Sequence, residues 1–185
     1  MSHPLDNIPL LPHVFVMDYE VIIAGGGLNG LTLALALDSA RIRTVIIDKN
    51  PRMTAGKSGF DGRSYALAAS SKKMLEVLGL WGNLAKDAQP ILEIKVSDGH
   101  AGEAPSPFVM QFNQEDLGQG PMGYTVEDRH LRPVLHNALK HSGVTFFPDC
   151  EILSQTTHST NTAVTLNSGI TLIASLLVGA DGRNS

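Results

Sequence analysis

A glycine-rich turn between an apolar strand and an apolar helix constrains this chain more than any other feature. The strand-forming run Tyr19 to Ala24 leads into Gly-Gly-Gly-Leu-Asn-Gly at residues 25–30, a Gly-x-Gly-x-x-Gly fingerprint. Gly25 permits the sharp turn, Gly27 leaves the backbone open to a pyrophosphate, and Gly30 allows the helix to pack closely on the sheet. The free N–H groups at the helix start favour phosphate oxygens. The pattern predicts a βαβ unit that binds a dinucleotide.

The segments around the fingerprint support this interpretation. A helix-forming run follows without an internal breaker, and a second apolar strand is predicted at 44–47. Asp48 closes that strand 18 positions after Gly30, near the spacing expected of an acid that accepts hydrogen bonds from a ribose. The alternative to a dinucleotide site is that a glycine-rich turn and an acid at the end of a strand occur together by chance. The motif alone does not separate FAD from NAD.

Composition bounds the remaining possibilities. The 185 residues suit one domain or slightly more, and 43% hydrophobic with 17% charged residues is ordinary for a globular protein. The net charge of −4, without a basic run, argues against nucleic-acid binding. Cys150 is the single cysteine, so an internal disulfide is excluded. No apolar run approaches the roughly 20 residues that a membrane helix needs.

The two ends of the chain carry their own expectations. Residues 1–18 are expected to be a disordered leader, because prolines interrupt 1–16 and no secretory signal pattern is present. Deleting residues 1–16 should leave folding intact, and loss of soluble protein would contradict this. At the other end, a last apolar strand at 176–178 runs into Asp181 and Gly182 with nothing after Ser185. We expect a polypeptide that is cut short, with exposed strand edges that favour self-association.

Between these ends, the apolar spacing predicts an alternation of helices and strands. A long loop at 49–62 is expected to be functional. Helices are predicted at 70–80 and at 128–142, where Pro133 is expected to set the first turn. Strands are predicted at 91–97, 107–112, 122–126, 144–147, 151–155, 162–166 and 170–174. The segment 162–174 reads as a hairpin that turns at residues 167–169.

Three motifs together resemble the class A flavoprotein monooxygenases, and most closely the ubiquinone-biosynthesis hydroxylases. The first is the fingerprint at 21–30 with Asp48. The second is Gly-Phe-Asp-Gly-Arg-Ser-Tyr-Ala-Leu-Ala at 59–68, followed by Leu-Gly-Leu-Trp at 78–81 and Val-Ser-Asp at 96–98. The third is Val-Gly-Ala-Asp-Gly-Arg-Asn-Ser at 178–185. The resemblance covers residues 19–185.

The resemblance implies an α/β fold: a Rossmann-like FAD-binding βαβ domain with part of an inserted antiparallel sheet of the substrate domain. It implies FAD as cofactor, NADPH as co-substrate, and dioxygen. In the family, a flavin C4a-hydroperoxide delivers oxygen to an electron-rich ring. The implied substrate is a polyprenylated phenol, and other ubiquinone-biosynthesis proteins are candidate partners. The expected location is the cytoplasm, with a peripheral place at the inner membrane left open.

Carried over residue by residue, the resemblance assigns cofactor-binding roles. The glycine turn would cradle the pyrophosphate and Asp48 would hold the ribose. Arg63 would reach FAD, Arg129 would approach the ribityl chain, and Asp181 with Gly182 would contact FAD and NADPH. The expected cofactor-binding residues are Gly25, Gly26, Gly27, Leu28, Asn29, Gly30, Asp48, Lys49, Arg63, Arg129, Asp181 and Gly182. A solvated surface arginine is the simpler interpretation for Arg63 and Arg129, and an ordinary turn for Asp181-Gly182.

No residue is assigned a catalytic role, because the family's later segments, which would complete the active site, have no counterpart here. No metal is expected, since the seven histidines lack ligand spacing. Three interpretations stay open: the N-terminal FAD-binding portion of an aromatic-ring hydroxylase of ubiquinone biosynthesis, inactive by itself; another flavoprotein oxidoreductase of the same fold; or a non-catalytic FAD-binding or scaffold fragment.

Overall fold

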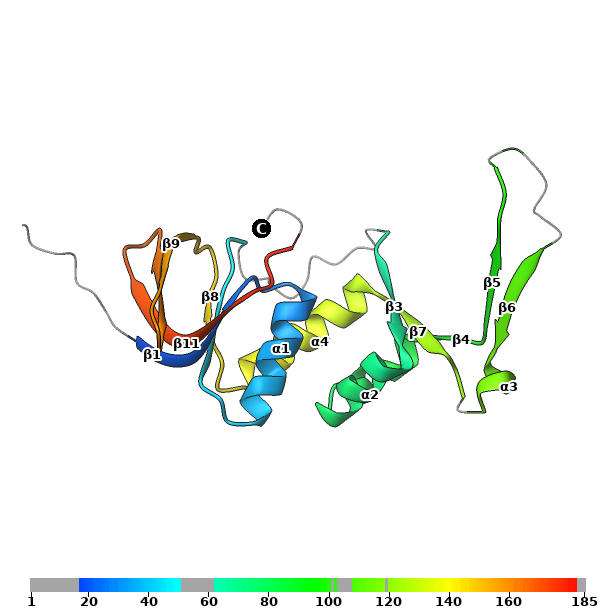
Figure 1. Cartoon of the computed structure of the whole chain (residues 1–185). Coiled ribbons are helices and arrows are strands. Elements are labelled where there is room, and N and C mark those ends of the chain that lie inside the picture. The colour runs from blue at the N-terminus through cyan, green and yellow to red at the C-terminus, as the bar shows by residue number, and fades with distance from the viewer. Residues whose placement is uncertain (1–16, 51–61, 101, 103–107, 119, 183–185) are drawn as a thin grey trace, which may run out of the picture. The chain divides into compact units, whose positions relative to one another are not determined.

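A computed structural model describes residues 17–50, 62–100, 102, 108–118 and 120–182. The chain divides into two compact units, which we describe separately: residues 1–53 with 139–185, and residues 54–138. The first unit is therefore built from two segments far apart in the sequence. Figure 1 labels most of the helices and strands used below.

The first unit is organised around one six-stranded sheet. Its spatial order is β8 (Thr145–Phe147), β2 (Thr44–Ile47), β1 (Met17–Ala24), β11 (Thr171–Gly179), β10 (Thr162–Leu166) and β9 (Ile152–Thr157). The pairs joining β8, β2, β1 and β11 are parallel, whereas β10 pairs with β11 and β9 in antiparallel fashion. β1 thus lies in the interior of the sheet, which explains its continuous apolar run.

Apolar side chains on the sheet form the core of this unit. The buried cluster contains Tyr19, Ile22, Val45, Ile47, Val164, Leu166, Leu172 and Ala174. Helix α1 (Leu28–Ser39) contacts β1 and β2 and buries Gly30, Leu31, Ala34 and Leu35. Burying each large aliphatic side chain of such a core contributes about 1.5–3 kcal/mol. The core therefore fixes the strand ends that carry the candidate site.

The second unit contains a three-stranded antiparallel sheet. Its order is β3 (Ser64–Ala68), β7 (Gly123–Glu127) and β4 (Gln89–Ile91). Helix α2 (Ala69–Val77), the short 3₁₀ turns at Trp81–Asn83 and Ala85–Asp87, and helix α4 (Asp128–Lys140) complete it. The Trp81 and Tyr124 rings meet edge to face at 4.8 Å between centroids. Leu75, Leu84, Val126 and Leu135 are buried.

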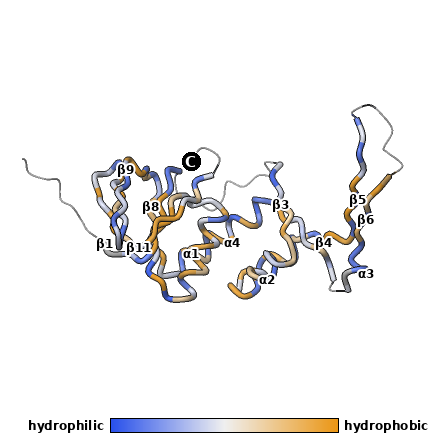
Figure 2. Tube along the Cα trace, viewed as in Figure 1, coloured by the Kyte–Doolittle hydropathy of each residue, from blue (hydrophilic) through white to orange (hydrophobic). Residues whose placement is uncertain are grey.

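A separate two-stranded hairpin belongs to the same unit. It pairs β5 (Glu93–Ser97) with β6 (Val109–Asn113), and the four-residue helix α3 (Gln114–Leu117) follows. The register places Ile94 opposite Phe112 and Val96 opposite Met110. Because alternate residues share a face, these four side chains form one apolar face, and each is at least 42% exposed. Figure 2 shows hydrophobic residues on both strands.

Several sequence predictions are confirmed and others are wrong. The α/β class is confirmed, and β10 and its hairpin turn lie where predicted, with the Gly169 N–H donating to the Leu166 carbonyl. The predicted strand at 91–97 is instead two strands, because β4 pairs with β7 and β5 with β6. The strands predicted at 170–174 and 176–178 are one, β11, since β1 pairs along its length.

The starts of strand β1 and of helix α4 also differ from the sequence predictions. β1 begins at Met17, so the predicted leader ended two residues too late; its residues 1–16 lie outside the described residues. Helix α4 begins at Asp128, so Pro133 lies inside the helix and does not set its first turn. Most of the predicted loop at 49–62 also lies outside the described residues.

Candidate functional site

The turn after β1 has a backbone that only glycine fits at its first position. Gly25 adopts a φ of +112°, and its N–H donates to the Ile47 carbonyl of β2 over 2.7 Å. A Cβ at Gly25 would lie 2.4 Å from the Ala180 oxygen. Strand β11 ends there, and the Ala180 N–H donates to the Ala24 carbonyl over 2.7 Å. The sharp turn expected at Gly25 is therefore packed against the segment that follows β11.

The other two fingerprint glycines have different surroundings. A Cβ at Gly30 would lie 1.9 Å from the Gly25 oxygen, so this glycine allows helix α1 to pack closely under the turn. A Cβ at Gly27 would meet no atom of the described residues within 4 Å. Space is therefore open beside the Gly27 backbone, as the approach of a pyrophosphate requires.

The start of helix α1 is suited to an anion. Gly27 is its N-cap and supplies no side-chain cap, and the first turn carries no acidic residue. The first hydrogen bond within the helix is donated by Leu31, so the N–H groups of Leu28 and Asn29 precede it. Those groups and the positive end of the helix dipole favour phosphate oxygens.

Asp48 lies directly after β2 and reaches the glycine turn. Its Oδ2 accepts a hydrogen bond from the Gly26 N–H over 2.6 Å. Its Oδ1 accepts from the backbone N–H of Asn50 over 2.8 Å and from the Asn50 side-chain amide over 2.9 Å. The structure thus brings the predicted acid to the fingerprint, while Lys49 is exposed.

Asp181 and Gly182 follow β11 at the same end of the sheet. A Cβ at Gly25 would lie 2.7 Å from the Asp181 Cα, so the backbones of the two segments touch. Because β1, β2 and β11 are parallel, their carboxyl ends share one edge. Ligands of open α/β sheets bind at this edge. The first unit therefore gathers the predicted residues of the glycine turn, Asp48 and the Asp181 segment.

The remaining two predicted residues, Arg63 and Arg129, lie in the second unit. Arg63 precedes β3 and its Nη2 lies 3.4 Å from Asp128 Oδ2, with the Arg63 side chain 58% exposed. Arg129 instead forms an ion pair with Glu127 through its Nε. The structure therefore does not bring the two arginines to one carboxylate.

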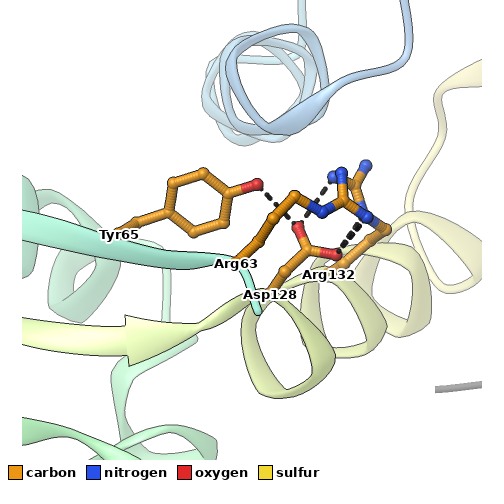
Figure 3. A network of polar contacts seen from close by, with 4 residues as sticks. All are labelled: Arg63, Tyr65, Asp128 and Arg132. Carbon is orange, nitrogen blue, oxygen red and sulfur yellow. Dashed lines mark hydrogen bonds and ion pairs between the residues drawn. The ribbon is translucent and has the colours of Figure 1, made fainter. Parts of the chain in front are cut away.

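Asp128 is the centre of a polar cluster that the sequence reasoning missed. Its Oδ1 accepts from the Tyr65 hydroxyl over 2.9 Å and from Arg132 Nη2 over 2.8 Å, and its Oδ2 accepts from Arg132 Nε over 3.0 Å (Figure 3). The Asp128 N–H also donates to the Arg63 carbonyl. With a side chain 6% exposed, Asp128 joins the start of β3 to the start of α4.

The contacts of this cluster shift its pKa values. Burial alone would raise the pKa of Asp128, but the hydrogen bonds from Arg132 and Tyr65 outweigh it and hold that pKa below its ordinary value. The hydrogen bond to Asp128 raises the pKa of Arg132. Burial, and then the hydrogen bond to Asp128, raise the pKa of Tyr65. The carboxylate is thus ionised and the phenol neutral at neutral pH.

Some of the missed residues left a signal in the sequence. Asp128 and Arg132 are four apart, a spacing that predicts an ion pair on one helix. Asp48 and Asn50 have the spacing of an aspartate turn, in which the side chain accepts from the backbone two residues on. No local pattern singles out Tyr65, because its partner lies 63 positions away. Cys150, the single cysteine, is half-buried against the core cluster.

The described part of the chain contains neither a metal-binding cluster nor a membrane-spanning helix. Within residues 17–50, 62–100, 102, 108–118 and 120–182, no group of three or more His, Cys, Asp or Glu side chains is placed to hold a metal ion. Among the same residues, no helix is long and apolar enough to cross a membrane.

Comparison with known families decides what kind of domain this is. The family described as "FAD binding domain" matches residues 18–185. The chain belongs to the FAD-binding domain family. The FAD-binding domain is similar to ubiquinone hydroxylase UbiL of Rhodospirillum rubrum, with 38% identity over 90% of this chain and 38% of that protein. It is 28% identical to 3-demethoxyubiquinol 3-hydroxylase of Escherichia coli, over 90% of this chain and 42% of that enzyme.

Solved structures agree on the fold. The flavin-dependent monooxygenase PieE, in complex with FAD and substrate, superposes on the FAD-binding domain with a TM-score of 0.69 at 21% identity. The match covers 91% of this chain and 31% of PieE. The FAD-binding domain thus spans about two-fifths of the length of the ubiquinone hydroxylases that it matches.

Proposed function

We propose that this chain is the FAD-binding portion of an NAD(P)H- and dioxygen-dependent hydroxylase that acts on an aromatic ring in ubiquinone biosynthesis. The observation that carries the proposal is the glycine turn of the first unit. The backbone beside Gly27 is open, no acid occupies the first turn of α1, and the Asp48 carboxylate meets Gly26. The identity of 38% with ubiquinone hydroxylase UbiL supports the choice of pathway.

Each predicted residue has a proposed task in holding the cofactor. The N–H groups at the start of α1 bind the pyrophosphate, and Asp48 accepts a hydrogen bond from the adenosine ribose. Arg63 donates to the pyrophosphate, and Arg129 approaches the ribityl chain. The segment of Asp181 and Gly182 contacts FAD and the nicotinamide co-substrate. Once bound, FAD would supply the redox chemistry that couples NADPH oxidation to dioxygen activation.

The substrate, partners and location belong to the same proposal. The proposed substrate is a polyprenylated phenol at the surface of the inner membrane. The enzyme itself has a cytoplasmic or a peripheral membrane location. Other proteins of ubiquinone biosynthesis are the proposed partners. These assignments rest on the relatives and on the family motifs at 59–68 and 178–185.

Titration of the purified chain with FAD tests the proposal. We expect saturable quenching of flavin fluorescence, weakened at least tenfold by Gly27→Val, whose side chain enters the open space, and by Asp48→Ala, which removes the ribose acceptor. Lys86→Ala is a control, because Lys86 is exposed in a 3₁₀ turn and is none of the residues assigned to FAD. Binding of NAD(P)H without binding of FAD would contradict the proposal.

A further inference from the structure

The Asp48 carboxylate is held by donors from two different segments. Gly26, in the turn after β1, donates its N–H to Oδ2 over 2.6 Å. Asn50, two residues beyond Asp48, donates both its backbone N–H and its side-chain amide to Oδ1, over 2.8 and 2.9 Å. The first contact ties the carboxylate to the glycine turn, and the other two fix the direction in which the chain leaves β2.

These contacts leave a defined acceptor capacity. An ionised carboxylate offers about four lone-pair positions, two on each oxygen. The two donors of Asn50 occupy those of Oδ1, and Gly26 occupies one of those of Oδ2. Among the described residues, one acceptor position of Asp48 therefore remains, and it lies on Oδ2, the oxygen beside the glycine turn.

The surroundings of Oδ2 are narrow. A Cβ at Gly26 would lie 2.6 Å from Oδ2 and 3.0 Å from Cε2 of Phe146 on β8. The torsion that rotates a carboxylate about its last bond is intrinsically broad. Without the Asn50 amide, only the backbone N–H groups of Gly26 and Asn50 would hold the carboxylate, one on each oxygen, and it could turn and direct its remaining lone pair elsewhere.

We propose that Asn50 is a positioning residue of the adenosine end of the site. Its side-chain amide fixes the rotation of the Asp48 carboxylate, so that Oδ2 presents one acceptor position to a ribose hydroxyl. The inference rests on the proposed function and adds a residue to it. The ligand class is the nucleoside diphosphate end of a dinucleotide. Asn50 is exposed, so its replacement leaves the core unchanged.

Binding of ADP and of 2′,3′-dideoxy-ADP to the full chain tests this inference, because the two ligands differ only in the ribose hydroxyls. We expect the wild-type chain to prefer ADP about tenfold, the worth of one hydrogen bond to a charged acceptor. Asn50→Ala should reduce that preference to about threefold or less. Asn50→Ser, which restores a short donor, should recover part of it. Thermal melting of each variant reports folding.

The outcomes separate this inference from the proposed function. An equal preference for ADP in the wild type and in Asn50→Ala, with FAD still bound, overturns the role of Asn50 and leaves the proposed function standing. A wild-type chain that binds FAD but does not distinguish ADP from 2′,3′-dideoxy-ADP also overturns the role of Asn50. A chain that binds neither FAD nor ADP contradicts the proposed function itself. A merely structural role would lower the melting temperature without changing the preference.

Discussion

At the scale of single residues, the fingerprint glycines serve the different purposes that the motif predicts. The sequence predicts all three, and the structure assigns Gly30 to packing and Gly27 to open space. The motif could be recognised because its glycines are local in sequence. The role of Tyr65 could not be recognised, because its partner Asp128 lies 63 positions away. Asn50 and Asp128 have a local signal in their spacing from Asp48 and Arg132, but that spacing does not show what else the fold brings to the two carboxylates.

Gly30→Ala and Gly27→Ala should therefore separate folding from binding. Gly30→Ala forces a methyl group against the Gly25 carbonyl and should lower the free energy of unfolding by about 1–3 kcal/mol. Gly27→Ala should lower it by less than about 1 kcal/mol, since Gly27 has an ordinary extended φ of −71° as the N-cap. It should still weaken FAD binding. Urea denaturation measures the free energy of unfolding, and FAD titration measures binding. Equal free energies of unfolding for the two variants would contradict this assignment.

The Asp128 cluster makes a prediction about pH. Because its pKa in the folded chain lies below the ordinary value, Asp128 stabilises the fold above the unfolded pKa of about 3.9, and that stability is lost as pH falls through the folded pKa. Asp128→Asn should cost about 3 kcal/mol at neutral pH, because it leaves Arg132 without its anion. The difference should shrink in acid.

Denaturation of both chains across the acid range measures this pH dependence. Asp149→Asn is a control, because Asp149 is exposed. A cost of Asp128→Asn that stays constant into acid would show that the ionised carboxylate does not stabilise the fold.

At the scale of elements, prediction succeeded where the strand or helix is specified by its own apolar pattern. β2 and β10 were predicted because their apolar or alternating residues lie in one short run. β4 was missed as a separate strand because it contains Pro90 and is defined by pairing with β7, over 30 positions later. The division between β4 and β5 therefore depends on partners that local sequence does not identify.

The hairpin of β5 and β6 predicts self-association through its exposed apolar face. The double substitution Val96→Lys and Met110→Lys should abolish concentration-dependent association while changing the free energy of unfolding by less than about 0.5 kcal/mol. Gln111→Lys is the matched control, because Gln111 lies on the opposite, polar face beside Glu93. Light scattering at rising concentration measures the effect; a monomeric wild-type chain would contradict it.

At the scale of the whole molecule, the chain joins a sheet-based unit formed from its two ends to a second unit formed from its middle. The sequence predicted the FAD-binding βαβ core and its family, because the fingerprint, Asp48 and the two later motifs appear in order. The family resemblance implied an inserted antiparallel sheet, but the residues alone did not predict where the division falls, because β11 pairs with β1 across more than 150 positions. Such pairing is set by the core of the sheet.

Competitive binding of FAD and NADPH to the purified chain tests the central claim most directly. Equilibrium dialysis with both ligands present reports which one occupies the glycine turn. We predict that FAD binds with saturation at one site per chain and that excess NADPH does not displace it. NADPH binding that excludes FAD, or the absence of any FAD binding by a folded chain, would contradict the assignment of the glycine turn, Asp48 and helix α1 to an FAD site.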